Sequence, residues 1–248
     1  MGADTLWNGP PQRTSAYTVR TNTMSKGRGF AFLTAATVLA VLLTLLGYQW
    51  PSLWLVYLFK PLATLSLILL AFLGWKADRT SYSQWIVIGL VFSLIGDVLL
   101  IWPNQYFLPG LLAFLLTHIA YLVAFTRDCS IPARLLVWLA YLAIAAGVYA
   151  ILLPTLPSGL DVPVAVYALV LSMMAGQAMG RFFVMRTGSA QRAAIGALLF
   201  LISDLLLAFH RFRQPLLYAT ILILVPYYLG QWLIASSLWS ARRLAIPL

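Results

Sequence analysis

Eight apolar segments, each long enough to cross a lipid bilayer, constrain the fold of this chain more than any other feature. A membrane-spanning helix needs about 20 mostly apolar residues, and turn-forming or helix-breaking residues separate the segments. They are 30–49, 53–75, 84–102, 107–126, 133–153, 162–185, 193–210 and 215–239. Because the connections are too short to hold a soluble catalytic domain, the sequence predicts an all-α integral membrane protein, a bundle of eight transmembrane helices.

The composition excludes a water-soluble globular fold. Apolar residues make up 62% of the chain and charged residues 9%, whereas a soluble domain has roughly 45–50% and about 25%. A net charge of +10 in a soluble protein would suggest a nucleic-acid partner. Here the basic residues lie at the ends of apolar segments, so we expect membrane lipids and no nucleic acid as partners.

The ends of the chain differ in composition from the apolar segments. Residues 1–29 are polar and contain Gly9, Pro10 and Pro11, so they bury too little apolar surface to fold and are predicted to be a disordered tail. Residues 30–240 form the predicted transmembrane domain, and residues 241–248 a short basic tail.

The distribution of Lys and Arg predicts the orientation in the membrane. With both termini in the cytoplasm, thirteen basic residues lie on the cytoplasmic side, only Arg211 and Arg213 lie on the other side, and Lys60 lies within a segment. This bias follows the positive-inside rule. We therefore expect a multi-pass protein of a bacterial inner membrane or an equivalent membrane, with both termini cytoplasmic.

Four ionisable residues stand out within the apolar segments, away from their ends on the cytoplasmic side: Lys60, Asp97, His118 and Asp204. Such residues are costly in a bilayer and therefore mark functional sites by default. At about 1.5 Å per residue, each lies roughly 8–16 Å below the outer end of its segment, within the outer half of a core about 30 Å thick. The sequence thus predicts one charged layer, with a site that opens toward the non-cytoplasmic half.

Simpler interpretations exist for each of these residues. Lys60 and one aspartate could form a structural ion pair, and His118 could be a buried histidine bonded to a carbonyl. One pair would suffice for packing, however, and two carboxyl groups, one protonated and one ionised, suit acid and base catalysis.

A transporter or proton-coupled channel would also place ionisable groups within the membrane. No inverted repeat is evident, and the layer lies away from the midplane where transporter sites usually occur. A serine hydrolase acting on ester lysophospholipids is a third possibility, which the missing G-x-S-x-G motif disfavours.

Arg211 follows Asp204 by seven residues, at the predicted outer end of the same segment. A guanidinium can bind phosphate through two hydrogen bonds, so Arg211 is a candidate for binding a lipid headgroup, although it could also simply extend to the interface. The single cysteine, Cys129, excludes an intramolecular disulfide and a cysteine metal cluster. We expect no metal and no organic cofactor.

Several short motifs contain these residues. They are Lys60-Pro61-Leu62, Gly96-Asp97, the Phe107, Gly110, Ala113-Phe114, His118 and Tyr121 series, the Gly196-Ala197, Phe200 and Ser203-Asp204 series, His210-Arg211-Phe212, and Tyr227-Tyr228 with Gln231. Their order and spacing over about residues 30–240 resemble the YhhN family of membrane proteins, which includes the animal TMEM86 lysoplasmalogenases. His210 departs from the family, where an Asn-like residue often precedes the Arg-Phe pair.

The resemblance implies an eight-helix hydrolase that cleaves the vinyl ether bond of lysoplasmalogens, alkenyl lysophospholipids. The products would be a fatty aldehyde and glycerophosphoethanolamine or glycerophosphocholine. We expect Asp97 and Asp204 to act as acid and as base or stabiliser, in an order that stays open, with Lys60 keeping one of them ionised and His118 orienting water. The expected substrate-binding residues are Tyr121, Ser203, Arg211, Tyr227, Tyr228 and Gln231.

Overall fold

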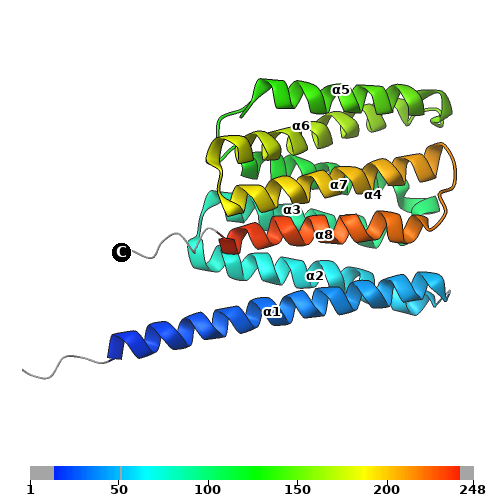
Figure 1. Ribbon diagram of the computed structural model, residues 1–248. Helices are drawn as coiled ribbons and strands as arrows, with labels where there is room; N and C mark the ends of the chain where they lie inside the picture. Colours follow the sequence, from blue (N-terminus) through cyan, green and yellow to red (C-terminus); the bar gives the residue numbers. More distant parts are fainter. Residues whose placement is uncertain (1–13, 51, 241–248) are drawn as a thin grey trace, which may run out of the picture.

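The computed structural model describes residues 14–50 and 52–240, and side chains from residue 27 to residue 239 except residue 51. Within these residues the chain forms eight α-helices and one short 3-10 helix, η1 (Figure 1). They are α1 (Thr14–Gln49), α2 (Leu53–Asp78), α3 (Ser81–Leu99), α4 (Pro103–Phe125), α5 (Leu135–Leu152), η1 (Leu153–Thr155), α6 (Asp161–Met185), α7 (Gly188–Phe212) and α8 (Ala219–Ser240). All eight α-helices contain a stretch long and apolar enough to cross a membrane. The chain is a multi-pass integral membrane protein, as predicted.

Six of the helices form a closed ring. In the order α2, α3, α4, α6, α7 and α8, each helix packs against the next, and α8 packs against α2. The remaining two lie outside the ring, α1 against α2 and α8, and α5 against α6 and α7, and Figure 1 shows them at opposite edges of the bundle. Every residue of α5 is described, and only Leu152 among them is buried, so α5 presents most of its surface to lipid.

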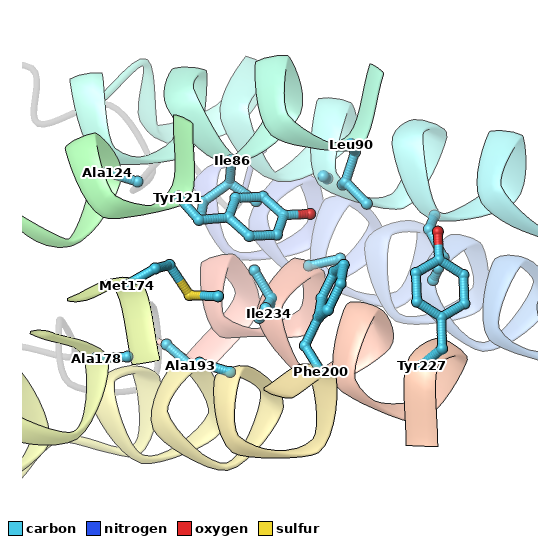
Figure 2. Packing of buried hydrophobic residues seen from close by; sticks show 14 of the residues in the cluster. Ile86, Leu90, Tyr121, Ala124, Met174, Ala178, Ala193, Phe200, Tyr227 and Ile234 are labelled. Carbon is cyan, nitrogen blue, oxygen red and sulfur yellow. The ribbon is translucent and has the colours of Figure 1, made fainter. Parts of the chain in front are cut away.

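Aromatic and aliphatic side chains fill the centre of the ring. Figure 2 shows Tyr121, Phe200, Tyr227 and Ile234 from α4, α7 and α8 pointing into one buried cluster. The backbones of α7 and α8 approach each other closely, because a Cβ added at Gly196 would lie 2.6 Å from the carbonyl oxygen of Gly230. Small residues at such crossings let membrane helices pack backbone against backbone.

The predicted disordered tail is wrong for residues 14–29, because α1 begins at Thr14. Pro10 and Pro11 precede this point, and no proline interrupts the helix that follows. A helix satisfies its own backbone hydrogen bonds, so it can continue beyond the apolar stretch, which begins at Gly27. Residues 1–13 and 241–248, the remaining parts of the predicted tails, lie outside the described residues.

Two helices begin earlier than predicted because of their N-caps. The hydroxyl of Thr80 accepts a hydrogen bond from the backbone of Ser83, and α3 begins at Ser81 rather than 84. Thr187 caps α7 in the same way, and α7 begins at Gly188 rather than 193. A threonine N-cap satisfies a free amide of the first turn, so each helix extends into the polar connection.

Candidate active site

Asp97, near the end of α3, is held by a cation and two hydroxyl groups. Its Oδ1 lies 3.8 Å from the Nζ atom of Lys60 on α2, and both side chains are almost fully buried. Its Oδ2 accepts hydrogen bonds from Thr64, 2.5 Å away, and from the hydroxyl of Tyr227 on α8, 2.7 Å away. A cation and directed donors are the partners that the ionised form of a carboxyl group requires when it is buried.

Asp204, on α7, contacts a tyrosine and a histidine. The hydroxyl of Tyr167 on α6 donates a hydrogen bond to its Oδ2, 2.5 Å away. The Nε2 atom of His118 on α4 lies 3.2 Å from the same oxygen and 2.9 Å from the Tyr167 hydroxyl. Among the described residues, no Lys or Arg forms an ion pair with Asp204, and the buried Nδ1 atom of His118 has no hydrogen-bond partner.

Both aspartates line one cavity of about 290 Å³, which we call the polar cavity. Its charged and polar lining residues are Tyr48, Lys60, Asp97, Ser203, Asp204, His210, Arg211, Thr220 and Tyr227. The structure therefore brings Lys60 and both aspartates together from three helices, α2, α3 and α7. His118, the fourth residue of the predicted charged layer, does not line this cavity but contacts Asp204. Each aspartate has its own partners on a different side of this cavity.

Arg211 lies at the exposed end of the polar cavity. Its Nη1 donates a hydrogen bond to Asn104 Oδ1, 3.1 Å away, and its guanidinium lies over the ring of Phe107, 5.3 Å from the centroid. These contacts hold the cation above the two aspartates. The neighbouring His210 accepts a hydrogen bond at Nδ1 from the backbone of Leu216, which secures the connection to α8.

A second cavity, of about 90 Å³, lies between α4, α5, α6 and α7, and we call it the apolar cavity. Most of its lining residues are aliphatic or aromatic, among them Leu111, Ile144, Val148, Leu171 and Leu201. Five residues line both cavities: Leu100, Phe107, Phe114, Asp204 and Leu207. The two cavities thus adjoin, and Asp204 is the only charged residue common to both.

Tyr121, Tyr228 and Gln231 are not among the residues that line the polar cavity. The hydroxyl of Tyr121 donates to Gln231 Oε1, the Nε2 of Gln231 donates to Ser93 Oγ, and the hydroxyl of Tyr228 donates to the carbonyl oxygen of Lys60. Tyr121 and Gln231 thus share one buried hydrogen-bond network, and Tyr228 is bonded separately to the backbone of α2. Ser203 and Tyr227 do line the cavity, and the hydroxyl of Ser203 donates to the carbonyl of Ile223.

Two hydrogen-bond partners of the aspartates were missed by the sequence analysis, Thr64 and Tyr167. Thr64 lies one helical turn after Lys60, so the same-face spacing could have identified it. Tyr167 lies in a segment with no ionisable residue near it, and only the fold brings it to Asp204, 37 positions away. In the described part of the chain, no three His, Cys or Asp side chains are grouped so that they could hold a metal ion.

Known proteins resemble this chain over most of its length. Residues 55–238 match the model of the YhhN family. Lysoplasmalogenase TMEM86A of Bos taurus is 38% identical over 190 residues, which cover 74% of this chain and 77% of the relative. Lysoplasmalogenase TMEM86B of Homo sapiens is 36% identical over 195 residues, which cover 78% of each protein.

A bacterial relative extends the comparison. The uncharacterized membrane protein YhhN of Escherichia coli O157:H7 is 29% identical over 196 residues, which cover 78% of this chain and 91% of the relative. No solved structure matches the chain.

Proposed function

The chain belongs to the YhhN family, and from this membership we propose that it is an intramembrane hydrolase of lysoplasmalogens, as its relatives named lysoplasmalogenase are. It would cleave the vinyl ether bond and release a fatty aldehyde and glycerophosphoethanolamine or glycerophosphocholine. The observation that carries the proposal is that two aspartates with different partners, Asp97 buried and Asp204 partly buried, line one cavity, and that Asp204 also borders an apolar cavity.

Vinyl ether hydrolysis makes three chemical demands on such a site. A proton must be delivered to the outer alkene carbon, which leaves an oxocarbenium ion. A negative charge must stabilise that cation. A water molecule then adds to the carbon next to oxygen and loses a proton to a base, and the resulting hemiacetal collapses to the aldehyde and the glycerol hydroxyl.

We assign the role of acid to Asp204. It borders the apolar cavity, so it lies where an apolar chain would meet the polar part of a lipid. Among the described residues it has no Lys or Arg partner, and its recorded hydrogen bonds involve only Oδ2. Its Oδ1 is therefore available to carry and deliver the proton.

We assign the role of stabiliser and base to Asp97. Lys60, Thr64 and Tyr227 surround its carboxylate and favour the ionised form. An ionised carboxylate in a cavity shielded from water stabilises a nearby cation more strongly than it would in water. It could then accept the proton that the attacking water loses.

Tyr167 and His118 would position Asp204. The hydroxyl of Tyr167 donates to Oδ2, and His118 Nε2 contacts both groups, so the carboxyl group is fixed in one orientation. His118 could also assist the collapse of the hemiacetal by moving a proton. Neither residue needs a metal or an organic cofactor for this role.

The two cavities suit the two parts of a lysophospholipid. The phosphate would bind at Arg211, at the exposed end of the polar cavity, and the alkenyl chain would enter the apolar cavity. Asp204 and Arg211 are seven residues apart on α7, a rise of about 10 Å. The glycerol and ether oxygen would fill this interval, with the vinyl ether bond beside Asp204. By the positive-inside rule, the polar cavity would open to the non-cytoplasmic side.

The direct test is aldehyde release from an alkenyl lysophospholipid by the purified protein in detergent. We expect release by the wild type and none by a folded Asp204→Asn variant, and no hydrolysis of the matched ester lysophospholipid. Hydrolysis of the ester alone would replace the proposal with an ester hydrolase. Absence of any hydrolysis, together with flux into sealed vesicles, would replace it with transport.

A further inference from the structure

A third cavity, of about 430 Å³, lies at the opposite end of the bundle from the polar cavity. It is found where α3 and α7 begin and where α6 and α8 end, and Tyr82, Arg127, Asp128, Arg181 and Ser189 are among its lining residues. We call it the arginine cavity. The proposed hydrolase function makes no use of it.

Arg181, on α6, has a donor that no described residue satisfies. The side chain is almost fully buried, and its Nε and Nη2 donate to the two carboxylate oxygens of Asp128, at 2.7 and 2.6 Å. The guanidinium lies over the ring of Tyr82, 4.6 Å from its centroid. Its Nη1 is buried and has no hydrogen-bond acceptor among the described residues. A buried donor without a partner is destabilising and calls for a ligand or water.

The beginnings of two helices add further donors at the same cavity. The first residues of α3 and α7, Ser81 and Gly188, both line it. The N-caps Thr80 and Thr187 satisfy only one first-turn amide each through their hydroxyl groups. A helix begins with free amides and a partial positive charge, so two such ends at one cavity favour an anion.

Both acidic residues at the cavity already have hydrogen-bond partners, Asp78 at its Oδ1 atom and Asp128 at both carboxylate oxygens. Asp78 accepts hydrogen bonds from the backbone of Thr80 and the hydroxyl of Ser83, and Asp128 is engaged by Arg181. Apart from Asp78 Oδ2, the groups left over are donors, namely Arg181 Nη1, the free amides and the exposed guanidinium of Arg127. A ligand that complements them must carry acceptors in several directions.

From these observations we propose that the arginine cavity binds a phosphate group, either that of a phospholipid headgroup or that of a small soluble phosphate. A tetrahedral phosphate presents oxygens to a guanidinium and to two helix ends at once, which a planar carboxylate does less well. The site is separate from the polar cavity, because the two lie near opposite ends of α3, which carries Ser81 at its start and Asp97 near its end.

Two substitutions of Ser81, by residues of equal size that differ in charge, test this proposal without disturbing the fold. Ser81 is exposed at the first position of α3, where an acidic residue favours the helix. Ser81→Asp adds a negative charge beside the site, and Ser81→Asn adds the same volume without charge. We expect Ser81→Asp to weaken phosphate binding about tenfold or more through charge repulsion, and Ser81→Asn to bind within about twofold of the wild type.

The measurement uses the purified full chain in detergent with two probes. The first is the shift in thermal unfolding temperature with sodium phosphate, compared with sodium chloride at the same ionic strength. The second is native mass spectrometry with dioleoyl phosphatidic acid, compared with dioleoylglycerol, which has the same chains but no phosphate. Stabilisation by inorganic phosphate identifies a soluble ligand, and selective retention of phosphatidic acid without that stabilisation identifies a lipid.

A double variant removes the charges of Arg181 and Asp128 from the site. In Arg181→Gln combined with Asp128→Asn, the buried pair becomes neutral and still able to form a hydrogen bond, and we expect binding to be lost while the protein stays folded. Equal binding by the wild type and Ser81→Asp overturns the proposal. So does the absence of both the phosphate shift and the lipid retention in the wild type.

Discussion

Asp97 and Asp204 line the same cavity, yet their immediate neighbours differ in charge. Asp97 has Lys60 at 3.8 Å and accepts two hydroxyl hydrogen bonds, on the side of α2 and α8. Asp204 has Tyr167 and His118 on the side of α4 and α6, and it borders the apolar cavity. The two aspartates thus lie in different environments because different helices surround them.

This difference separates two tasks that one carboxyl group cannot perform at the same moment. The group that stabilises a cation must be ionised, and the group that protonates carbon must hold a proton. A cation and two donors favour the first task at Asp97. The absence of a Lys or Arg partner among the described residues and the adjoining apolar cavity suit the second at Asp204.

The largest effects are expected when the aspartates themselves are replaced. Asp204→Asn removes the proton donor and should lower the rate of aldehyde release by about 10²–10⁴-fold. Asp97→Asn removes the stabilising charge and should lower the rate by about 10²–10³-fold. Steady-state rates with an alkenyl lysophospholipid measure both, and a variant at either position with full activity would contradict the role given to that residue.

The cation beside Asp97 gives the next largest effect, on stability. Lys60→Met leaves a buried carboxylate without its partner and should lower the free energy of unfolding by about 3–5 kcal/mol. The double variant Lys60→Met with Asp97→Asn should recover much of this loss, since no charge remains unpaired. Denaturant unfolding in detergent measures the change, with Lys76→Met at an exposed site of the same helix as the control. If Lys60→Met destabilised the protein no more than the control does, the ion pair with Asp97 would not contribute to stability.

Removing the tyrosine hydroxyl groups that donate to the aspartates should cause smaller losses of stability, which differ between the two sites. If the proposed roles hold, Tyr227→Phe removes a hydrogen bond to an ionised carboxylate and should cost about 1.5–3 kcal/mol of stability, whereas Tyr167→Phe removes one to a protonated carboxyl group and should cost about 0.5–1.5 kcal/mol. The substitution is the same in both cases, so each variant is the control for the other. The reverse order in unfolding measurements would indicate that the two protonation states have been exchanged.

The smallest effect concerns the chain that enters the apolar cavity. Ala145 on α5 lines this cavity, and its neighbour Ala146 is exposed and does not. Ala145→Phe should reduce kcat/KM for a long alkenyl chain about tenfold, with less effect on a short chain, because a pocket distinguishes a few methylenes by about 1–3 kcal/mol. Ala146→Phe should leave the chain-length preference unchanged. Equal effects of the two variants would mean that the chain binds elsewhere.

The helix count and the charged layer could be predicted from the sequence because both depend on residue type and spacing along one helix. Apolar length identifies each span, and Lys60, Asp97 and Asp204 stand out because charged residues are rare there. The start of α1 could not be predicted in the same way, since hydropathy reports the part of a helix within the bilayer and not where the helix begins.

The partners of each aspartate could not be predicted, because they depend on which helices are neighbours. Tyr167 and Asp204 are brought together by the packing of α6 against α7, and Tyr227 and Asp97 by the approach of α8 to α3. Gln231 and Tyr121 show the opposite case. Their polar side chains suggested contact with a substrate, whereas the structure pairs them with each other behind the cavity.

The most direct test of different roles for the two aspartates is chemical rescue of Asp204→Ala and Asp97→Ala by formic acid, with aldehyde release measured at several pH values. Each substitution leaves space for a small carboxyl group. Our account predicts that Asp204→Ala regains activity in proportion to the concentration of undissociated formic acid, and that Asp97→Ala responds only to formate. Rescue of Asp97→Ala by the undissociated acid, with none for Asp204→Ala, would contradict it.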